Sequence, residues 1–330
     1  MSLTSTHWGT YHARVKDGRL IDMQPFAEDT DPNEIGRGIV DVIDNPARIA
    51  APMVRKSWLE TGPGSAPEKR GHDPFVEIDW PHANKLVAAE LDRVIKQFGN
   101  ESIFAGCYGW ASAGRFHHAP GHLHRFLNCL GGYTKSVNTY SFAAAEVIVP
   151  HVIGHFRNYI YNQTSWVSVR DHTDLFVAFG GVPLKNGQIG QGGLGRHIQR
   201  DSILAAHANG VRFVSVSPLR EDMIADVKAN WLAVRPNSDT ALMLALCHVL
   251  LTEDLHNKDF LDRYCVGFER FAAYLTGADD HQAKSPEWAA ALCGIDAARI
   301  RDLARSMAGS RTMLSFSWSL TRQAHGEQPF

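Results

Sequence analysis

The stretch Asp174–Phe179 (DLFVAF) is an apolar run that ends at the glycine pair Gly180-Gly181. A run of this length bounded by glycine is typical of a buried strand. The same order returns downstream, where an apolar run at Val211–Ser217 lies between helical segments at Ile198–Ala208 and Asp239–Leu251. Strands that alternate with helices form parallel sheets, because each helix carries the chain back across the sheet. The sequence therefore predicts an α/β fold with doubly wound, mostly parallel sheets.

The chain before this sheet divides into two further regions. Residues up to about Arg70 form short strand-like runs and turns, and end in a polar loop at Thr61–Arg70. From Asp79 apolar residues recur at spacings of three and four, which predicts a helix. Ser102–Cys107 is then a short apolar strand. We expect a small β-rich region at 1–70, a first α/β cofactor-binding region at 71–165, and a Rossmann-like dinucleotide-binding region at 166–330 that includes a strand at Met313–Trp318.

Two loops that follow the predicted strands carry residues suited to a nucleotide. They are Ser217-Pro218 and Pro236-Asn237-Ser238-Asp239. Ligands of open α/β sheets gather at the carboxyl ends of the strands. Asp239 can accept hydrogen bonds from the N1 and amino groups of guanine, or it can cap the following helix, and both interpretations stay open. Gly190–Gly195 (GQGGLG) lacks the preceding strand that a dinucleotide-binding glycine loop requires.

Composition and charge exclude some classes of partner. The 330 residues include 33 Lys and Arg against 35 Asp and Glu, a formal charge of −2. This balance gives no general attraction to nucleic acid or to an anionic membrane. The sequence contains no apolar run of the roughly 18 residues that a membrane span needs, and Met1–Thr10 lacks the pattern of an export signal. We expect no membrane span and a cytoplasmic location, or a periplasmic one if a signal has been removed.

The cysteines and histidines do not predict a metal cluster. The five cysteines show no C-x-x-C spacing, so we expect no iron–sulfur cluster in this chain and no disulfide framework. Four histidines gather at His117, His118, His122 and His124. His118 and His122 have the spacing of neighbours on a helix face, but Pro120-Gly121 lies between them and is expected to interrupt a helix. We therefore predict no zinc or iron site there.

Tyr108-Gly109-Trp110 is followed downstream by Asn138-Thr139-Tyr140-Ser141 and then by Pro150–Gly154 (PHVIG). Ser141 stands directly before the helix-forming run Phe142–Ile148, and the ordinary interpretation of a serine in that place is a helix N-cap. Serine is also an unusual protein ligand for a metal. Whether Ser141 caps a helix or binds a metal cannot be chosen from these residues alone.

Several further segments follow one another in an order that resembles a known family. They are His7-Trp8-Gly9, Pro52–Lys56 (PMVRK), Pro183-Leu184-Lys185, Ser215–Pro218 (SVSP), Trp231–Pro236 (WLAVRP), Trp318–Arg322 (WSLTR) and His325–Gln328 (HGEQ). With the tryptophan and serine motifs they resemble the dimethyl sulfoxide reductase family of molybdopterin oxidoreductases. Within it the pattern is similar to the serine-ligated group, which reduces dimethyl sulfoxide, trimethylamine N-oxide or biotin sulfoxide.

The resemblance implies a role for particular residues. Ser141 would bind molybdenum together with two molybdopterin guanine dinucleotides, and Trp110 and Tyr108 would donate hydrogen bonds to the oxygen that is transferred. Arg322 would line the substrate funnel, and Lys185 would lie near a pterin. The remaining residues implied in binding the cofactor are Ser217, Pro236, Asn237, Asp239, Trp318 and His325.

The resemblance also implies a reaction and its partners. The reaction would be oxygen-atom transfer from an S-oxide or N-oxide, with an S-oxide favoured by Tyr108-Gly109-Trp110, and an external electron donor would supply the electrons. Family members continue well beyond the motif that precedes Gln328-Pro329-Phe330, so the fold appears incomplete relative to the family. Two alternatives stay open: a fragment without activity that needs a C-terminal partner chain, and a plain nucleotide-binding α/β protein without molybdenum.

Overall fold

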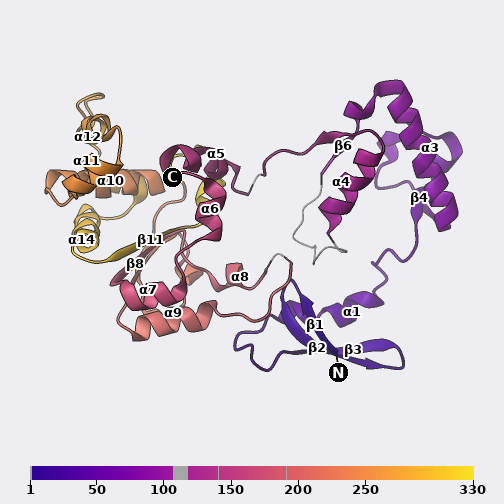
Figure 1. The fold of residues 1–330 in the computed structure, drawn as a ribbon, viewed down its shortest axis with the longest axis horizontal. Coiled ribbons are helices and arrows are strands. Elements are labelled where there is room, and N and C mark those ends of the chain that lie inside the picture. The colour runs from indigo at the N-terminus through magenta and orange to yellow at the C-terminus, as the bar shows by residue number, and fades with distance from the viewer. Residues whose placement is uncertain (1, 107–117, 140, 191) are drawn as a thin grey trace. The chain divides into compact units, whose positions relative to one another are not determined.

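The computed structural model describes residues 2–106, 118–139, 141–190 and 192–330. It has two compact units, Met1–Val137 with Ile189–Arg196, and Asn138–Gln188 with His197–Phe330. Figure 1 shows the elements of both. Residues 138–165 belong to the same unit as the following parallel sheet. This division into two differs from the expected boundaries at 70 and 165, and the assignment of functions to three regions stays a prediction.

The first unit begins with an antiparallel sheet of β1 (Ser2–Thr6), β2 (Gly9–Lys16) and β3 (Arg19–Pro25). The β2–β3 connection is Asp17-Gly18, and both residues have positive φ, of 52° and 76°. This is the conformation that tight hairpins require, and Asp-Gly adopts it readily. The glycine loop that we rejected as a nucleotide fingerprint packs on this sheet instead, because Leu194 donates to the Thr6 carbonyl (3.1 Å) and accepts from the Thr10 hydroxyl (2.9 Å).

Tyr11 fixes the chain that follows the sheet. Its ring is 1% exposed, and its hydroxyl donates to the Asn33 carbonyl at 2.6 Å. Gly36, in the turn η1 (Glu34–Gly36), packs flat against this ring, and a Cβ atom there would overlap the ring. A glycine is therefore required by close packing and not by backbone conformation.

Gly36→Ala is expected to lower the free energy of unfolding by about 1–3 kcal/mol, because an added methyl must displace a buried ring. Urea unfolding checks this. Gly38→Ala is the matched control, since its Cβ would lie 3.4 Å from the nearest atom, the Ile35 carbonyl oxygen. Equal stability of the two variants would contradict the packing that we describe around Tyr11.

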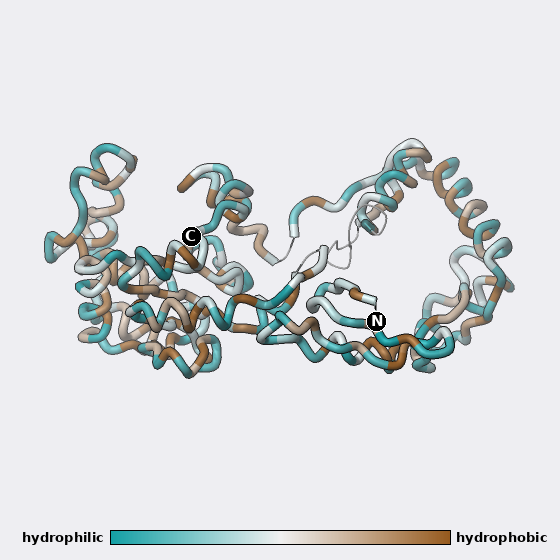
Figure 2. Tube along the Cα trace, turned by 60° about the horizontal axis from the view of Figure 1, so that its bottom comes forward, coloured by the Kyte–Doolittle hydropathy of each residue, from teal (hydrophilic) through white to brown (hydrophobic). Residues whose placement is uncertain are grey.

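The predicted helix after Asp79 is confirmed as α3 (Trp80–Phe98). Asp79 caps it by accepting from the His82 N–H at 2.8 Å, and Gly99 with φ 78° ends it. Figure 2 shows hydrophobic and hydrophilic residues alternating along this helix. The strand that follows is shorter than expected: β6 is only Phe104–Ala105, and it pairs in parallel with β7 (Thr134–Lys135), which the sequence did not indicate.

The expectation that Pro120-Gly121 interrupts a helix is wrong. Helix α4 runs over Ala119–Cys129 and contains both residues. Proline is tolerated there because first-turn N–H groups have no partner within the helix. His118 is the N-cap, and its Nδ1 accepts from the Gly121 N–H at 3.0 Å. This imidazole therefore serves as a cap. His117 lies outside the described residues.

The second unit contains a parallel sheet in the order β10-β9-β8-β11. Its strands are β8 (Leu175–Phe179), β9 (Arg212–Val216), β10 (Asn230–Leu232) and β11 (Thr312–Phe316). The predicted α/β class with a parallel, doubly wound sheet is confirmed. The chain starts at β8, adds strands on one side, and then crosses to β11 on the other side. The strand order therefore reverses between β8 and β11.

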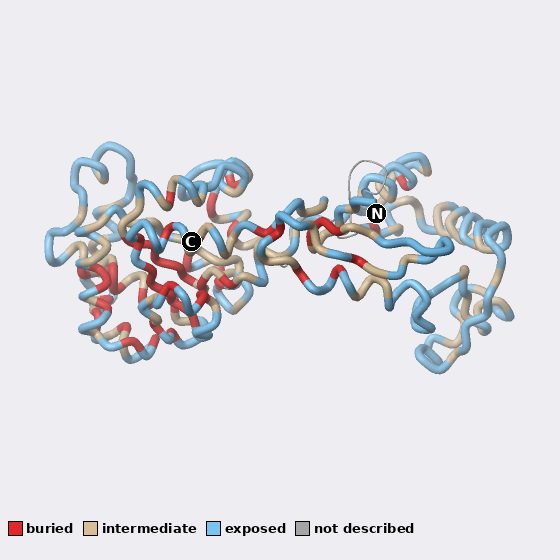
Figure 3. Tube along the Cα trace, turned by 90° about the horizontal axis from the view of Figure 1, so that it is seen from below, coloured by how far each residue is buried: buried red, intermediate tan, exposed pale blue. Residues whose placement is uncertain are grey.

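Helices cover both faces of this sheet (Figure 1). Alternate residues of β8 serve the two faces, as the period of a strand requires. Phe176 and Ala178 pack with α7 (Trp166–His172) and α9 (Gln199–Ala208), whereas Val177 and Phe179 pack with α10 (Asp239–Thr252), α13 (Pro286–Cys293) and α14 (Ala297–Ala308). Figure 3 shows that most buried residues lie in this unit.

The remaining elements are mostly short. They are α1 (Ile39–Ile43), β4 (Met53–Arg55), α2 (Lys56–Thr61), β5 (Phe75–Glu77), α5 (Ala143–Val152), α6 (Phe156–Tyr161), α8 (Leu184–Gly187), α11 (Lys258–Tyr264), α12 (Phe268–Thr276) and the 3₁₀ turn η7 (Trp318–Thr321). Within the part of the chain that the structure describes, no helix combines the length and apolar character needed to cross a membrane.

Candidate cofactor site

The point where the strand order reverses is the first place to look for a ligand, because open α/β sheets bind ligands at the carboxyl ends of the strands on either side of it. Here these ends belong to β8 and β11. Gly180 follows β8 with φ 83°, and a Cβ there would lie 2.5 Å from the Cβ of Ser317, which follows β11. Gly181 has φ 69° and lies equally close to Asp222. The loops at this edge therefore pack as closely as glycine allows.

Ser217, Asp222 and Lys185 form a polar chain at the same edge. Ser217 is 1% exposed, and its hydroxyl donates to Asp222 Oδ2 at 2.6 Å. Its backbone N–H donates to the Leu232 carbonyl at 3.2 Å. Both donors of Ser217 are thus engaged, so the residue shapes the loop and could offer a ligand only acceptor atoms. The Lys185 ammonium lies 3.7 Å from Asp222 Oδ1 and its side chain is 71% exposed, which suits an anionic ligand.

Asp239 is a buried acid at the start of α10. The N-cap of α10 is Ser238, so the helix-capping interpretation of Asp239 is wrong. Asp239 is 5% exposed, and burial raises the pKa of its carboxyl group. Among the described residues no cation lies within ion-pair distance of it. Asn237 directly before has φ 65°, a conformation that asparagine tolerates, and Asn237 and Pro236 are both exposed. A buried carboxylate without a cation suits a ligand that brings its own donors.

Ser141 lies just before α5, whose N-cap is Phe142 and not the serine. Its carbonyl accepts two hydrogen bonds from η7 and the residue after it, from Arg322 Nε at 3.0 Å and from the Thr321 hydroxyl at 3.2 Å. The fold thus brings together the predicted metal ligand and the predicted funnel arginine, although they are 181 positions apart. The role of Thr321 had no signal in the sequence.

Trp318 joins the same group of residues through ring contacts. Its ring centroid lies 4.9 Å from that of Phe142 and 5.7 Å from that of Phe156. The ring is therefore part of a local core. His325 does not join this group, because its side chain is 85% exposed and lies 4.0 Å from the Glu327 carboxylate. Tyr108 and Trp110 lie outside the described residues.

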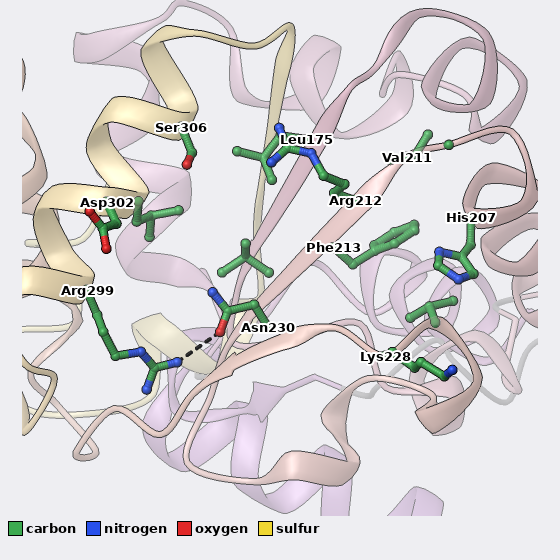
Figure 4. Close-up of a pocket in the computed structure, with 14 residues that line it drawn as sticks. Leu175, His207, Val211, Arg212, Phe213, Lys228, Asn230, Arg299, Asp302 and Ser306 are labelled. Carbon is green, nitrogen blue, oxygen red and sulfur yellow. Dashed lines mark hydrogen bonds between the residues drawn. The ribbon is translucent and has the colours of Figure 1, made fainter.

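A cavity of about 520 Å³ lies at the opposite edge of the sheet (Figure 4). Its lining includes the first residue of each of β8, β9 and β10, namely Leu175, Arg212 and Asn230. Arg299 reaches across to donate to Asn230 Oδ1 at 2.9 Å, shown as the dashed line in Figure 4. Because this cavity is at the amino ends of the strands, it is separate from the polar chain, Asp239 and Ser141.

Comparison with known proteins decides the family. The molybdopterin oxidoreductase N-terminal domain model matches residues 4–44, and the molybdopterin oxidoreductase model matches residues 48–330. The chain belongs to the molybdopterin oxidoreductase family. The resemblance drawn from the sequence motifs is confirmed, and this chain is an N-terminal portion of the family's fold.

The relatives of this molybdopterin oxidoreductase chain include three kinds of named reductase. It is 41% identical to the dimethyl sulfoxide/trimethylamine N-oxide reductase of Cereibacter sphaeroides over 99% of this chain and 39% of that protein. It is 41% identical to the biotin sulfoxide reductase of the same organism over 94% of this chain and 42% of that protein. It is 37% identical to the trimethylamine-N-oxide reductase of Vibrio cholerae serotype O1 over 99% of this chain and 40% of that protein. The chain thus spans about two fifths of these relatives.

A solved structure shows the same fold. The acetylene hydratase from Pelobacter acetylenicus superposes with a TM-score of 0.63 over 97% of this chain and 40% of that protein, at 21% sequence identity. This similarity supports the fold alone.

Proposed function

We propose that this chain provides the serine ligand and a dinucleotide site of a molybdenum-dependent oxidoreductase that reduces S-oxides or N-oxides. The observation that carries the proposal is the contact between Ser141 and Arg322 in a chain of this family. A serine that caps no helix, held by an arginine from the far end of the chain, fits a ligand role better than a local structural one.

The described residues fit a molybdopterin guanine dinucleotide. Asp239 offers a buried carboxylate whose hydrogen-bonding capacity matches the N1 and amino donors of guanine. Lys185 offers an exposed ammonium for a phosphate or a pterin. Gly180 and Gly181 keep the backbone at this edge free of side chains. We propose two such dinucleotides for each metal, with no iron–sulfur cluster in this chain.

The bound molybdenum would supply the oxygen-atom transfer, and the chain would supply position and charge. Ser141 must give up its hydroxyl proton to bind, which a highly charged metal makes feasible at neutral pH. Arg322 keeps its positive charge at every working pH and can attract a substrate oxyanion or carboxylate. Trp110 and Tyr108 would donate hydrogen bonds to the oxygen that is transferred.

The substrate and the partners follow from the same proposal. Tyr108-Gly109-Trp110 favours an S-oxide over an N-oxide, and relatives named for both kinds of substrate occur. Electrons would come from an external donor. A C-terminal partner chain is favoured by β11, whose residues are all partly or fully exposed although those of β8, on its inner side, are all buried. A fragment without activity of its own is the alternative function.

A reductase assay tests this proposal. The cofactor-loaded chain is assayed with a reduced viologen dye as donor and with dimethyl sulfoxide or trimethylamine N-oxide as acceptor, alone and with the complementary C-terminal part of the Cereibacter sphaeroides relative. We expect turnover with that part present and a higher kcat/KM for the sulfoxide. Loaded protein that reduces neither substrate in either form would contradict the proposed activity.

Trp110→Phe is expected to lower turnover and to leave the molybdenum content unchanged, because it removes one hydrogen-bond donor and retains an aromatic ring. A loss on the scale of about 10²-fold is typical of one donor to a developing charge. Turnover and metal content are measured on the same preparation. Loss of the metal would show that the tryptophan is structural.

A further inference from the structure

The turn at Trp318–Arg322 contacts Ser141 and Phe142 in three ways. Arg322 Nε donates to the Ser141 carbonyl at 3.0 Å, and the Thr321 hydroxyl is 3.2 Å from the same oxygen. The Trp318 ring packs on the Phe142 ring. The Thr321 hydroxyl also lies 2.8 Å from the Trp318 carbonyl, so this side chain links the turn to the serine. All of these residues belong to one compact unit.

Two donors on one carbonyl fix the position of Ser141. A backbone carbonyl oxygen has two lone pairs, and here both are directed to the turn. The peptide group that contains this carbonyl is planar, so fixing its oxygen also orients the bond to Phe142 and the Cα atom of Ser141. The direction of the Cα–Cβ bond then follows, and the χ1 torsion alone places the hydroxyl oxygen among three staggered positions.

We infer that Thr321 and Arg322 are positioning residues that hold the backbone of Ser141 so that its hydroxyl oxygen is directed toward the metal. The inference rests on the proposed function in one respect, that Ser141 is the ligand. It gives Arg322 a task besides the predicted one at the funnel, and the two are compatible because a guanidinium has five N–H donors and Nε is one of them. It gives Thr321 a task that no motif indicated.

The test uses the Ser141 carbonyl as its own reporter in the 330-residue chain without cofactor. Serine is labelled with ¹³C at the carbonyl and phenylalanine with ¹⁵N, which selects Ser-Phe pairs. The sequence has two, Ser141-Phe142 and Ser315-Phe316, and the second lies in β11 and serves as internal reference. Thr321→Val removes the hydroxyl donor at nearly constant volume, Thr321→Ser keeps it, and Arg322→Lys keeps the charge but loses the Nε donor.

We expect Thr321→Val and Arg322→Lys each to move the Ser141 carbonyl resonance upfield, with Ser315 unmoved, and Thr321→Ser to return Ser141 close to its wild-type position. An unmoved Ser141 resonance in both Thr321→Val and Arg322→Lys would overturn the inference. So would a shift in Thr321→Val that Thr321→Ser fails to reverse, because it would show a change of packing and not of a hydrogen bond.

A second readout uses the cofactor-loaded protein. Thr321→Val is expected to change the electron paramagnetic resonance signal of molybdenum, with Thr321→Ser restoring it. An unchanged signal in Thr321→Val would overturn the positioning role even where the carbonyl resonance has moved. Ser141→Ala separates the two claims, since a wild-type signal in that variant would remove the ligand assignment, while the carbonyl contact is made by the backbone and would remain measurable.

Discussion

Ser141→Ala is expected to abolish molybdenum-dependent reduction in a chain extended to the full length of its relatives. The loss should exceed the roughly 10–100-fold decrease that follows removal of a group behind a metal ligand, because here the ligand itself is removed. The fold should survive, since the Thr321 and Arg322 hydrogen bonds are made to the serine carbonyl, which alanine retains. Turnover and the molybdenum spectrum are the measurements.

Ser202→Ala is the matched control for this experiment. It removes a hydroxyl from α9, a helix that packs on one face of the sheet, and it should leave both turnover and spectrum unchanged. If Ser141→Ala keeps wild-type turnover and an unaltered metal spectrum, the ligand assignment is wrong.

Asp239→Asn is expected to have two opposite effects, a more stable free chain and a weaker guanine nucleotide complex. Burial raises the pKa of this carboxyl above its ordinary 3.8, so the folded chain holds the proton more tightly than the unfolded chain does. Stability is therefore lost as pH rises from about 3.8 through the raised pKa, and the loss is complete above it. Asparagine does not titrate, so the stability advantage of the variant should grow through that window and then level off.

The affinity of Asp239→Asn for guanosine diphosphate should fall, because an amide presents one acceptor and one donor group where guanine needs two acceptors. Each lost hydrogen bond to a charged group is worth about 1.5–3 kcal/mol. Asp302→Asn, an exposed acid on α14, is the control and should match the wild-type chain. Calorimetric titration with guanosine diphosphate measures the affinity, with adenosine diphosphate as the competing base. Unchanged guanosine diphosphate affinity in Asp239→Asn would exclude this carboxylate from the guanine site.

Local patterns in the sequence were enough to predict the regular part of the fold. The β8, β9 and β11 runs and the amphipathic α3 depend on nearest neighbours along the chain, so spacing and glycine boundaries reveal them. The error at Pro120 arose because proline breaks a helix interior but is accepted in a first turn, and the sequence does not say which turn a residue occupies. The pairing of β6 with β7 joins two short segments and carries no periodic signal.

The candidate site could be predicted only in part. Ser141 and Arg322 were identified by resemblance, yet their contact spans 181 positions and depends on how the second unit packs. The engagement of both Ser217 donors and the place of Asp239 after the N-cap are tertiary and local geometric facts that residue types do not reveal. Thr321 escaped notice because a threonine in a short motif has many ordinary roles.

The most direct test of the account is the molybdenum and guanine content of the 330-residue chain, purified from a host that makes the cofactor. The account predicts that molybdenum and guanine are both retained by the folded wild-type chain, and that Asp239→Asn retains less guanine. A folded wild-type chain that carries neither molybdenum nor guanine would contradict the claim that these residues form a metal and dinucleotide site in this chain.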